Sequence, residues 1–170
     1  MHPTDILSQE HRAIESMLDA LEAQIRQAQS GGLFPRLFFD EALDFFRNFA
    51  DGCHHAKEEN LLFPRMRERG VPQDGGPIGV MLAEHDQGRG YLKTVREHLD
   101  SAEAGDPDAC NVVYGNSAAY IEMLRHHIQK EDRILFRMAK MVLEPDDVLE
   151  LQREFAAVTV PERFRDRVPA

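Results

Sequence analysis

The sequence predicts an all-α protein, an up-down-up-down antiparallel four-helix bundle followed by a short C-terminal helix and tail. Apolar residues recur at alternating three- and four-residue steps along four long segments, the spacing of a helix face buried in a bundle. Groups of Pro, Gly and Asp separate these segments, and no stretch carries a strand signal of any weight. We expect the bundle to be one domain over residues 1–143, with the helix and tail over residues 144–170.

Cap and turn residues place the boundaries of the first two helices. Thr4 suits the N-cap of the first helix, and Ser30-Gly31-Gly32 ends it. Pro35 suits the first turn of the second, which is predicted to run to about Gly70. Pro64 is expected to end this helix early or to kink it.

The same signals divide the second half of the chain. A third helix is predicted from residues 74–77 to about Gly105, and a fourth from Asp106-Pro107 to about Leu143. A short amphipathic helix follows over residues 146–157, and residues 161–170 are expected to be a tail.

Charge and composition exclude several classes of partner. The chain of 170 residues has a formal net charge of −10, which argues against nucleic acid and anionic membranes as partners. No stretch approaches the roughly 20 apolar residues of a membrane span, and the first residues lack the features of a signal peptide. We expect a cytoplasmic protein with Cys53 and Cys110 reduced.

Polar residues interrupt the apolar stripe of every predicted bundle helix. Each stripe contains one histidine, and in the second and fourth helices a glutamate follows four residues later, on the same helix face. These candidate metal ligands are His11, His54, Glu58, His85, His127 and Glu131.

The positions of the histidines put them in one layer. His11 lies 20 residues before Gly31, and His54 lies 19 residues after Pro35. The spacings in the second half of the chain are both 20 residues. At roughly 1.5 Å rise per residue, all four histidines lie about 30 Å from the same end of an antiparallel bundle.

The chain is also an internal duplication. A shift of 74 residues relates His11 to His85, and a shift of 73 relates both His54 to His127 and Glu58 to Glu131. The repeat selects His54 over its neighbour His55, which is interpreted as a structural histidine. The acidic residues next to the candidate ligands, Glu10, Glu59 and Glu84, are interpreted as a solvated face.

Four imidazoles and two carboxylates in an apolar layer require a neutralising partner, since an unpaired buried carboxylate loses several kcal/mol of hydration. A mixed nitrogen and oxygen set of this size suits a pair of iron or manganese ions. Zinc is less favoured, because the ligands are too many for one tetrahedral site. Ferritin-like diiron bundles use Glu-x-x-His pairs, and this sequence has none.

A His, a His-x-x-x-Glu, a second His and a second His-x-x-x-Glu on successive helices resemble the hemerythrin family, in the branch called the HHE cation-binding domain. The resemblance covers roughly residues 4–143. It implies a non-heme diiron centre in which Glu58 and Glu131 bridge the ions and the four histidines are terminal ligands, with an open position that reacts with dioxygen.

The sequence departs from the oxygen-carrying hemerythrins on the third helix. These proteins have a second histidine one turn after the first, where this chain has Arg89. The departure argues against reversible oxygen carriage. Glu15, which the repeat places opposite Arg89, is a candidate replacement ligand or partner, and Tyr120 is either a donor facing the metal or an ordinary core residue.

The favoured function is a diiron protein that binds dioxygen, nitric oxide or iron itself, for sensing, storage or scavenging. The alternative is a diiron enzyme that reduces peroxide or oxygen, and a structural metal site is a weaker one. Whether the chain is an enzyme stays open, and the sequence names no substrate or redox partner.

Overall fold

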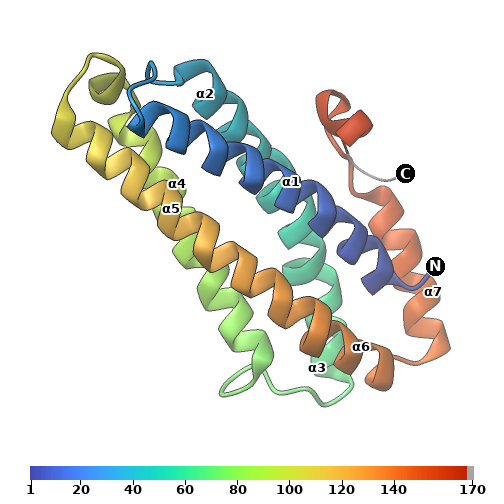
Figure 1. Cartoon of the computed structure of the whole chain (residues 1–170). Coiled ribbons are helices and arrows are strands. Elements are labelled where there is room, and N and C mark those ends of the chain that lie inside the picture. The colour runs from blue at the N-terminus through green and yellow to red at the C-terminus, as the bar shows by residue number, and fades with distance from the viewer. Residues whose placement is uncertain (168–170) are drawn as a thin grey trace.

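The computed structural model describes residues 1–167, and all regular secondary structure in this range is helical. Figure 1 shows long helical rods lying side by side, with the N-terminus near α7. The elements are α1 (Pro3–Gln29), α2 (Arg36–Phe45), η1 (Phe46–His55), η2 (Glu58–Leu62), α3 (Phe63–Glu68), α4 (Pro77–Glu103), α5 (Pro107–Lys130), η3 (Glu131–Leu135), α6 (Phe136–Val142), α7 (Pro145–Ala157) and η4 (Glu162–Arg167).

The rods form a helical bundle with a divided core. The second rod runs from α2 through η1 and η2 to α3, and the fourth runs from α5 through η3 to α6. A larger apolar cluster fills one end and includes Phe39, Phe45, Phe46, Phe49, Val95 and Leu124. A second cluster fills the other end and includes Leu7, Leu62, Phe63, Met66, Ile78 and Phe136. Buried histidines and glutamates lie between the two clusters along the rods; we call this region the histidine layer.

Three segments that border the histidine layer are π-helical. They are η1, η2 and η3, which contain or begin at His54, Glu58 and Glu131 respectively. The internal repeat extends to this feature, because η2 and η3 occupy equivalent positions of the duplicated sequence. Such π-helical turns are rare and occur frequently at functional sites.

Two predicted helix signals act differently from the expectation. The N-cap of α1 is His2 and not Thr4, since the His2 side chain accepts a hydrogen bond from the Thr4 backbone N–H and the Asp5 carboxylate accepts one from the His2 N–H. Pro64 does not end the second rod, which continues to Glu68. It lies in the first turn of α3, directly after the π-helical η2, so the helical backbone changes form next to Pro64, and the kink that was the other expectation stays a prediction.

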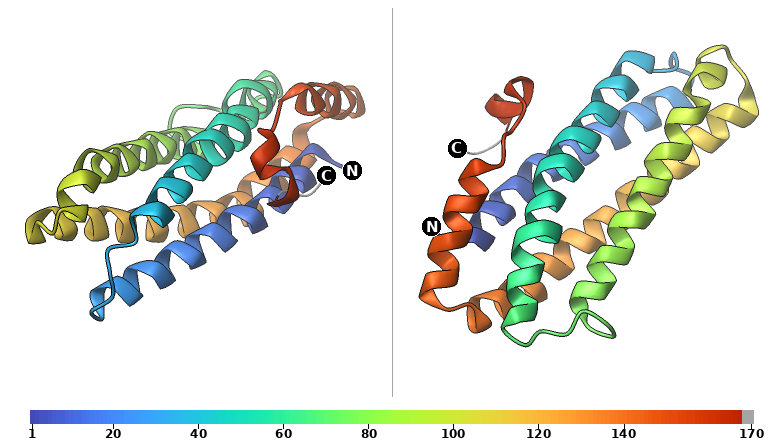
Figure 2. Two further views of the ribbon diagram at one scale, coloured as in Figure 1. Left: turned by 90° about the horizontal axis from the view of Figure 1, so that it is seen from above. Right: turned by 180° about the vertical axis from the view of Figure 1, so that it is seen from behind.

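The C-terminal segment is more structured than the predicted tail. Residues Glu162–Arg167 form the short helix η4, and Phe164 is buried edge-on against Phe45 with 5.5 Å between ring centroids. Arg163 forms an ion pair with Asp44. Residues 168–170 of the predicted tail lie outside the described part of the chain. Figure 2 shows α7 beside the bundle, where it packs on α1 and η2.

No helix within residues 1–167 has an apolar stretch long enough to cross a membrane.

An ion-pair cluster joins α7 to α3 and leads to a stability prediction. The buried Asp147 carboxylate accepts hydrogen bonds from Arg69 at 2.7 Å and Arg65 at 3.1 Å. Asp147→Asn is therefore expected to lower the free energy of unfolding by about 1–3 kcal/mol at neutral pH. Asp146→Asn, at the exposed neighbouring position, is the control, and equal losses in the two variants by urea denaturation would contradict the account.

The effect of Asp147→Asn depends on pH. Hydrogen bonding from Arg69, and then from the Glu144 backbone and Arg65, holds the pKa of the Asp147 carboxyl below its ordinary value. The folded pKa is depressed, so the carboxylate stabilises the fold above its unfolded pKa of about 4 and loses this contribution as the pH falls through the folded pKa. The difference between the wild type and Asp147→Asn should therefore shrink on acidification.

Candidate metal centre

The structure brings all six candidate ligands into the histidine layer, each with an exposed fraction of 2% or less. They come from α1, η1, η2, α4, α5 and η3, so every long rod contributes. The possible ligand atoms form two overlapping groups, each with all its atoms within 4.8 Å of one another. One group is His11, His54, Glu58 and Glu131, and the other is His55, Glu58, His85 and His127.

Each glutamate lies between histidines of two different helices. One oxygen of Glu131 is 3.2 Å from Nε2 of His11, and its other oxygen is 3.2 Å from Nε2 of His127. The two oxygens of Glu58 are each 3.6 Å from an Nε2, that of His54 and that of His85. Both carboxylates thus have one oxygen beside a histidine of each of the two groups.

The opposite nitrogen of each predicted histidine faces a carboxylate from another helix. The Nδ1 distances are 2.9 Å from His11 to Asp132, 3.0 Å from His54 to Glu10, 2.7 Å from His85 to Glu59 and 2.9 Å from His127 to Glu84. An Nδ1–H that donates to a carboxylate leaves the Nε2 of a neutral imidazole unprotonated. The Nε2 atoms of the four histidines thereby face into the layer, where those of His85 and His127 lie 3.1 Å apart.

Cationic side chains complete this outer support. Lys57 pairs with Glu10 and Lys130 pairs with Glu84. The remaining pairs are Arg12 with Asp132 at 2.5 Å and Arg89 with Glu59 at 2.6 Å. The interpretation of Glu10, Glu59 and Glu84 as a solvated face is therefore wrong, because all three orient histidines and Glu10 is buried.

Polar atoms of the histidine layer are buried with their hydrogen-bonding capacity unmet within residues 1–167, and Glu131 raises the pKa of His127 to about 9 against the effect of burial. Among the described residues, both oxygens of Glu58, one oxygen of Glu131 and Nε2 of His55 are buried without a hydrogen-bond partner. Burial and the nearby Glu131 raise the pKa of Glu58. Although burial opposes it, His127 and His11 lower the pKa of Glu131. Unpartnered carboxylate oxygens and imidazole nitrogens that face one another match the donors preferred by iron and related metals.

Arg89 and Glu15 do not form the pair that the repeat suggests. Glu15 pairs with Arg12 at 2.8 Å on the surface of α1. The Arg89 guanidinium reaches Asp51 at 2.7 Å and Glu59 at 2.6 Å. Arg89 therefore supports the carboxylates around the histidine layer.

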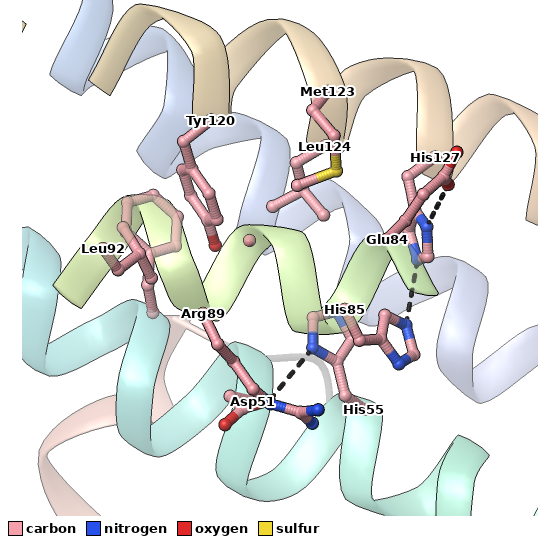
Figure 3. Close-up of a pocket in the computed structure, with 12 residues that line it drawn as sticks. Asp51, His55, Glu84, His85, Arg89, Leu92, Tyr120, Met123, Leu124 and His127 are labelled. Atoms are coloured by element: carbon pink, nitrogen blue, oxygen red, sulfur yellow. Dashed lines mark hydrogen bonds and ion pairs between the residues drawn. The ribbon is translucent and has the colours of Figure 1, made fainter. Parts of the chain in front are cut away.

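A small cavity adjoins the histidine layer on the side of His55, His85 and His127 (Figure 3). Its volume is about 20 Å³, which is room for about one water molecule. The Tyr120 hydroxyl points into it from α5, and burial raises the pKa of this hydroxyl, so it stays protonated at neutral pH. Gly88 also lines the cavity. It leaves room for the neighbouring side chains, because a Cβ at this position would lie 3.0 Å from Met123 Cε and 3.2 Å from Tyr120 Cε2.

Together, the helical fold and the two buried His/Glu groups define a helical protein whose core is suited to hold metal. The family model described as the Hemerythrin HHE cation binding domain matches residues 2–139. The chain belongs to this family.

The relatives are longer chains that match over only part of their length. Two uncharacterised proteins, from Mycobacterium tuberculosis (H37Rv) and Mycobacterium bovis, are each 26% identical over 153 residues, which cover 90% of this chain and 59% of theirs. The iron-sulfur cluster repair protein YtfE of Salmonella newport is 36% identical over 89 residues, which are 51% of this chain and 40% of YtfE. The chain thus spans about three fifths or less of these relatives. No solved structure matches it.

Proposed function

We propose that the chain is an up-down-up-down antiparallel four-helix bundle that holds two iron ions in its core, with His11, His54, Glu58, His85, His127 and Glu131 as ligands. The observation that carries this proposal is the placement of Glu58 and Glu131, whose two oxygens each lie beside a histidine of a different helix. The unpartnered oxygens of these buried glutamates support it as well. Residues 1–143 form the metal-binding unit, and α7 and η4 are appended to it.

The donor set favours iron over zinc. Six ligands, of which four are imidazoles and two are carboxylates, exceed what one tetrahedral zinc takes. Iron and manganese accept such mixed sets with higher coordination numbers. The name of the relative YtfE, an iron-sulfur cluster repair protein, also supports iron.

We propose further that the centre binds a diatomic ligand, dioxygen or nitric oxide, or takes up iron itself, for sensing, storage or scavenging. Reduced iron would supply an open coordination position for such a ligand. The cavity beside His55, His85 and His127 supports this choice, since it has room for about one molecule the size of water and none for an organic substrate.

The second candidate is an enzyme that reduces peroxide or oxygen. The observation that favours it is the protonated Tyr120 hydroxyl directed into the cavity. A donor in that position can hydrogen-bond to an oxygen atom of a molecule held in the cavity and orient it.

The test is the optical spectrum of protein loaded anaerobically with ferrous iron. We expect new absorption bands on addition of nitric oxide and on exposure to oxygen, and we expect Glu58→Ala to abolish them. A spectrum unchanged by either gas would count against the ligand-binding proposal. Steady peroxide consumption by the wild type that is lost in Glu58→Ala would favour the enzyme.

A further inference from the structure

His55 has the surroundings of a metal ligand, although the repeat in the sequence selects only its neighbour His54. Its ring lies in the histidine layer with an exposed fraction of 6%, and its Nε2 has no hydrogen-bond partner within the described chain. A possible ligand atom of His55 lies within 4.8 Å of those of Glu58, His85 and His127. The ring stacks on that of His85 with 3.9 Å between centroids, so one of the two rings must turn before both Nε2 atoms can bind the same ion.

The other nitrogen of His55 repeats the pattern of the predicted ligands. Its Nδ1 faces the Asp51 carboxylate at 3.4 Å, as Figure 3 shows, and Asp51 is in turn paired with Arg89. This is the same order of imidazole, carboxylate and cation that supports His11, His54, His85 and His127. A histidine with only a structural role would be expected to have partners for both nitrogens.

Arg89 connects His55 to the departure from the oxygen-carrying hemerythrins. It stands where those proteins have an additional histidine, and one guanidinium holds the carboxylates behind two imidazoles: Asp51 behind His55 and Glu59 behind His85. This chain thus has one histidine fewer on α4 than those proteins, and η1 contributes two histidines to the layer, His54 and His55.

We infer that His55 is a fifth histidine ligand, which binds the ion shared with His85 and His127 through Nε2, and that Asp51 and Arg89 are its positioning residues. This inference rests on the proposed two-ion centre. It assigns three imidazoles to that ion and two, from His11 and His54, to the other.

The deciding variant is His55→Asn. The asparagine amide nitrogen takes the place of Nδ1 and keeps a donor for Asp51, while the atom that would bind metal is removed. His126→Asn, at an exposed histidine of α5, is the matched control. Anaerobic titration with Fe²⁺, followed by elemental analysis, reports ions per chain, and the visible spectrum of the Co²⁺-loaded protein reports coordination.

We expect His55→Asn to bind one ion as the wild type does and to bind the second at least about tenfold more weakly, with a changed Co²⁺ spectrum. Asp51→Asn, which leaves the ligand in place, should weaken the second ion by about 10- to 100-fold, as is typical when a partner behind a ligand is lost. This variant decides the question if His55→Asn does not fold.

The assignment of His55 would be overturned if His55→Asn bound both Fe²⁺ ions with wild-type affinity and had the wild-type Co²⁺ spectrum. If His55→Asn does not fold, the same result in Asp51→Asn would overturn it. Either result would leave the two-ion centre intact. A wild type that binds no second ion would overturn both proposals, so the two failures are distinguishable.

Discussion

Removal of metal is expected to lower the melting temperature of the loaded protein by roughly 8–16 °C. An ion that binds only the folded state at a concentration of about 1,000 times its Kd stabilises that state by about 4 kcal/mol. In a chain of this size, each 1 kcal/mol shifts the melting temperature by about 2–4 °C. Thermal denaturation with and without a chelator measures the effect, and an unchanged melting temperature would show that the layer is stable without metal.

The same account predicts that Glu58→Leu has opposite effects on stability and on binding. Both oxygens of Glu58 lack a hydrogen-bond partner among residues 1–167, and burial raises the pKa of this carboxyl, so its ionised form is unfavourable there without a bound cation. An apolar residue of similar volume at a buried charged position is often neutral or stabilising by about 1–4 kcal/mol. The metal-free variant should therefore be at least as stable as the metal-free wild type, while metal no longer raises its melting temperature.

Glu122→Leu, at an exposed position of α5, is the control for Glu58→Leu and should respond to metal as the wild type does. If Glu58→Leu destabilised the metal-free protein by several kcal/mol, Glu58 would have a structural role that the unpartnered oxygens do not indicate.

Gly88→Val is expected to block the cavity without removing the metal. The new side chain would begin within 3.0 Å of Met123 Cε and 3.2 Å of the Tyr120 ring. The cavity has a volume of only about 20 Å³, so the two methyl groups of valine would fill it. We expect iron content to be unchanged and the rate of nitric oxide binding to the reduced protein, measured by stopped-flow absorption, to fall at least about tenfold, equivalent to about 1.4 kcal/mol in the barrier.

Gly90→Val is a matched control for this experiment. Gly90 lies on the same helix two residues later, and a Cβ there meets no other atom within 4 Å. Both variants replace a helical glycine by the same residue, so their intrinsic effect on α4 is the same. Equal rates in Gly88→Val and Gly90→Val would mean that the ligand reaches the centre by another route.

The helix boundaries could be predicted because local residues determine them. Gly31 and Gly105 follow α1 and α4 with φ of 101° and 89°, a conformation that side chains other than glycine rarely adopt. Prolines open α4, α5 and α7 at their first turns, as expected of a residue without an N–H. The grouping of the four histidines in one layer could be predicted from the polar residues that interrupt the apolar stripes and from the internal duplication.

The burial of His55 in the histidine layer could not be predicted from helical spacing. In an α-helix, adjacent residues point about 100° apart, so a stripe that includes His54 and Glu58 excludes His55. The π-helical segment η1, which ends at His55, changes this angular spacing, and both histidines are buried in the layer.

The carboxylates behind the histidines required the tertiary structure for a different reason. Glu10 and Glu84 are equivalent in the repeat, but each supports a histidine on a neighbouring helix and not the one beside it in sequence. Only the packing of the helices shows which carboxylate meets which imidazole.

The most direct test of the two-ion centre is the iron content per chain, by elemental analysis after anaerobic loading with ferrous iron. The account predicts about two ions per chain in the wild type and their loss in a His54→Ala, His127→Ala double variant, because each group of the layer then lacks a histidine. Little or no iron in the loaded wild type, or the same content in both proteins, would contradict the account and leave the histidine layer as a structural feature of the core.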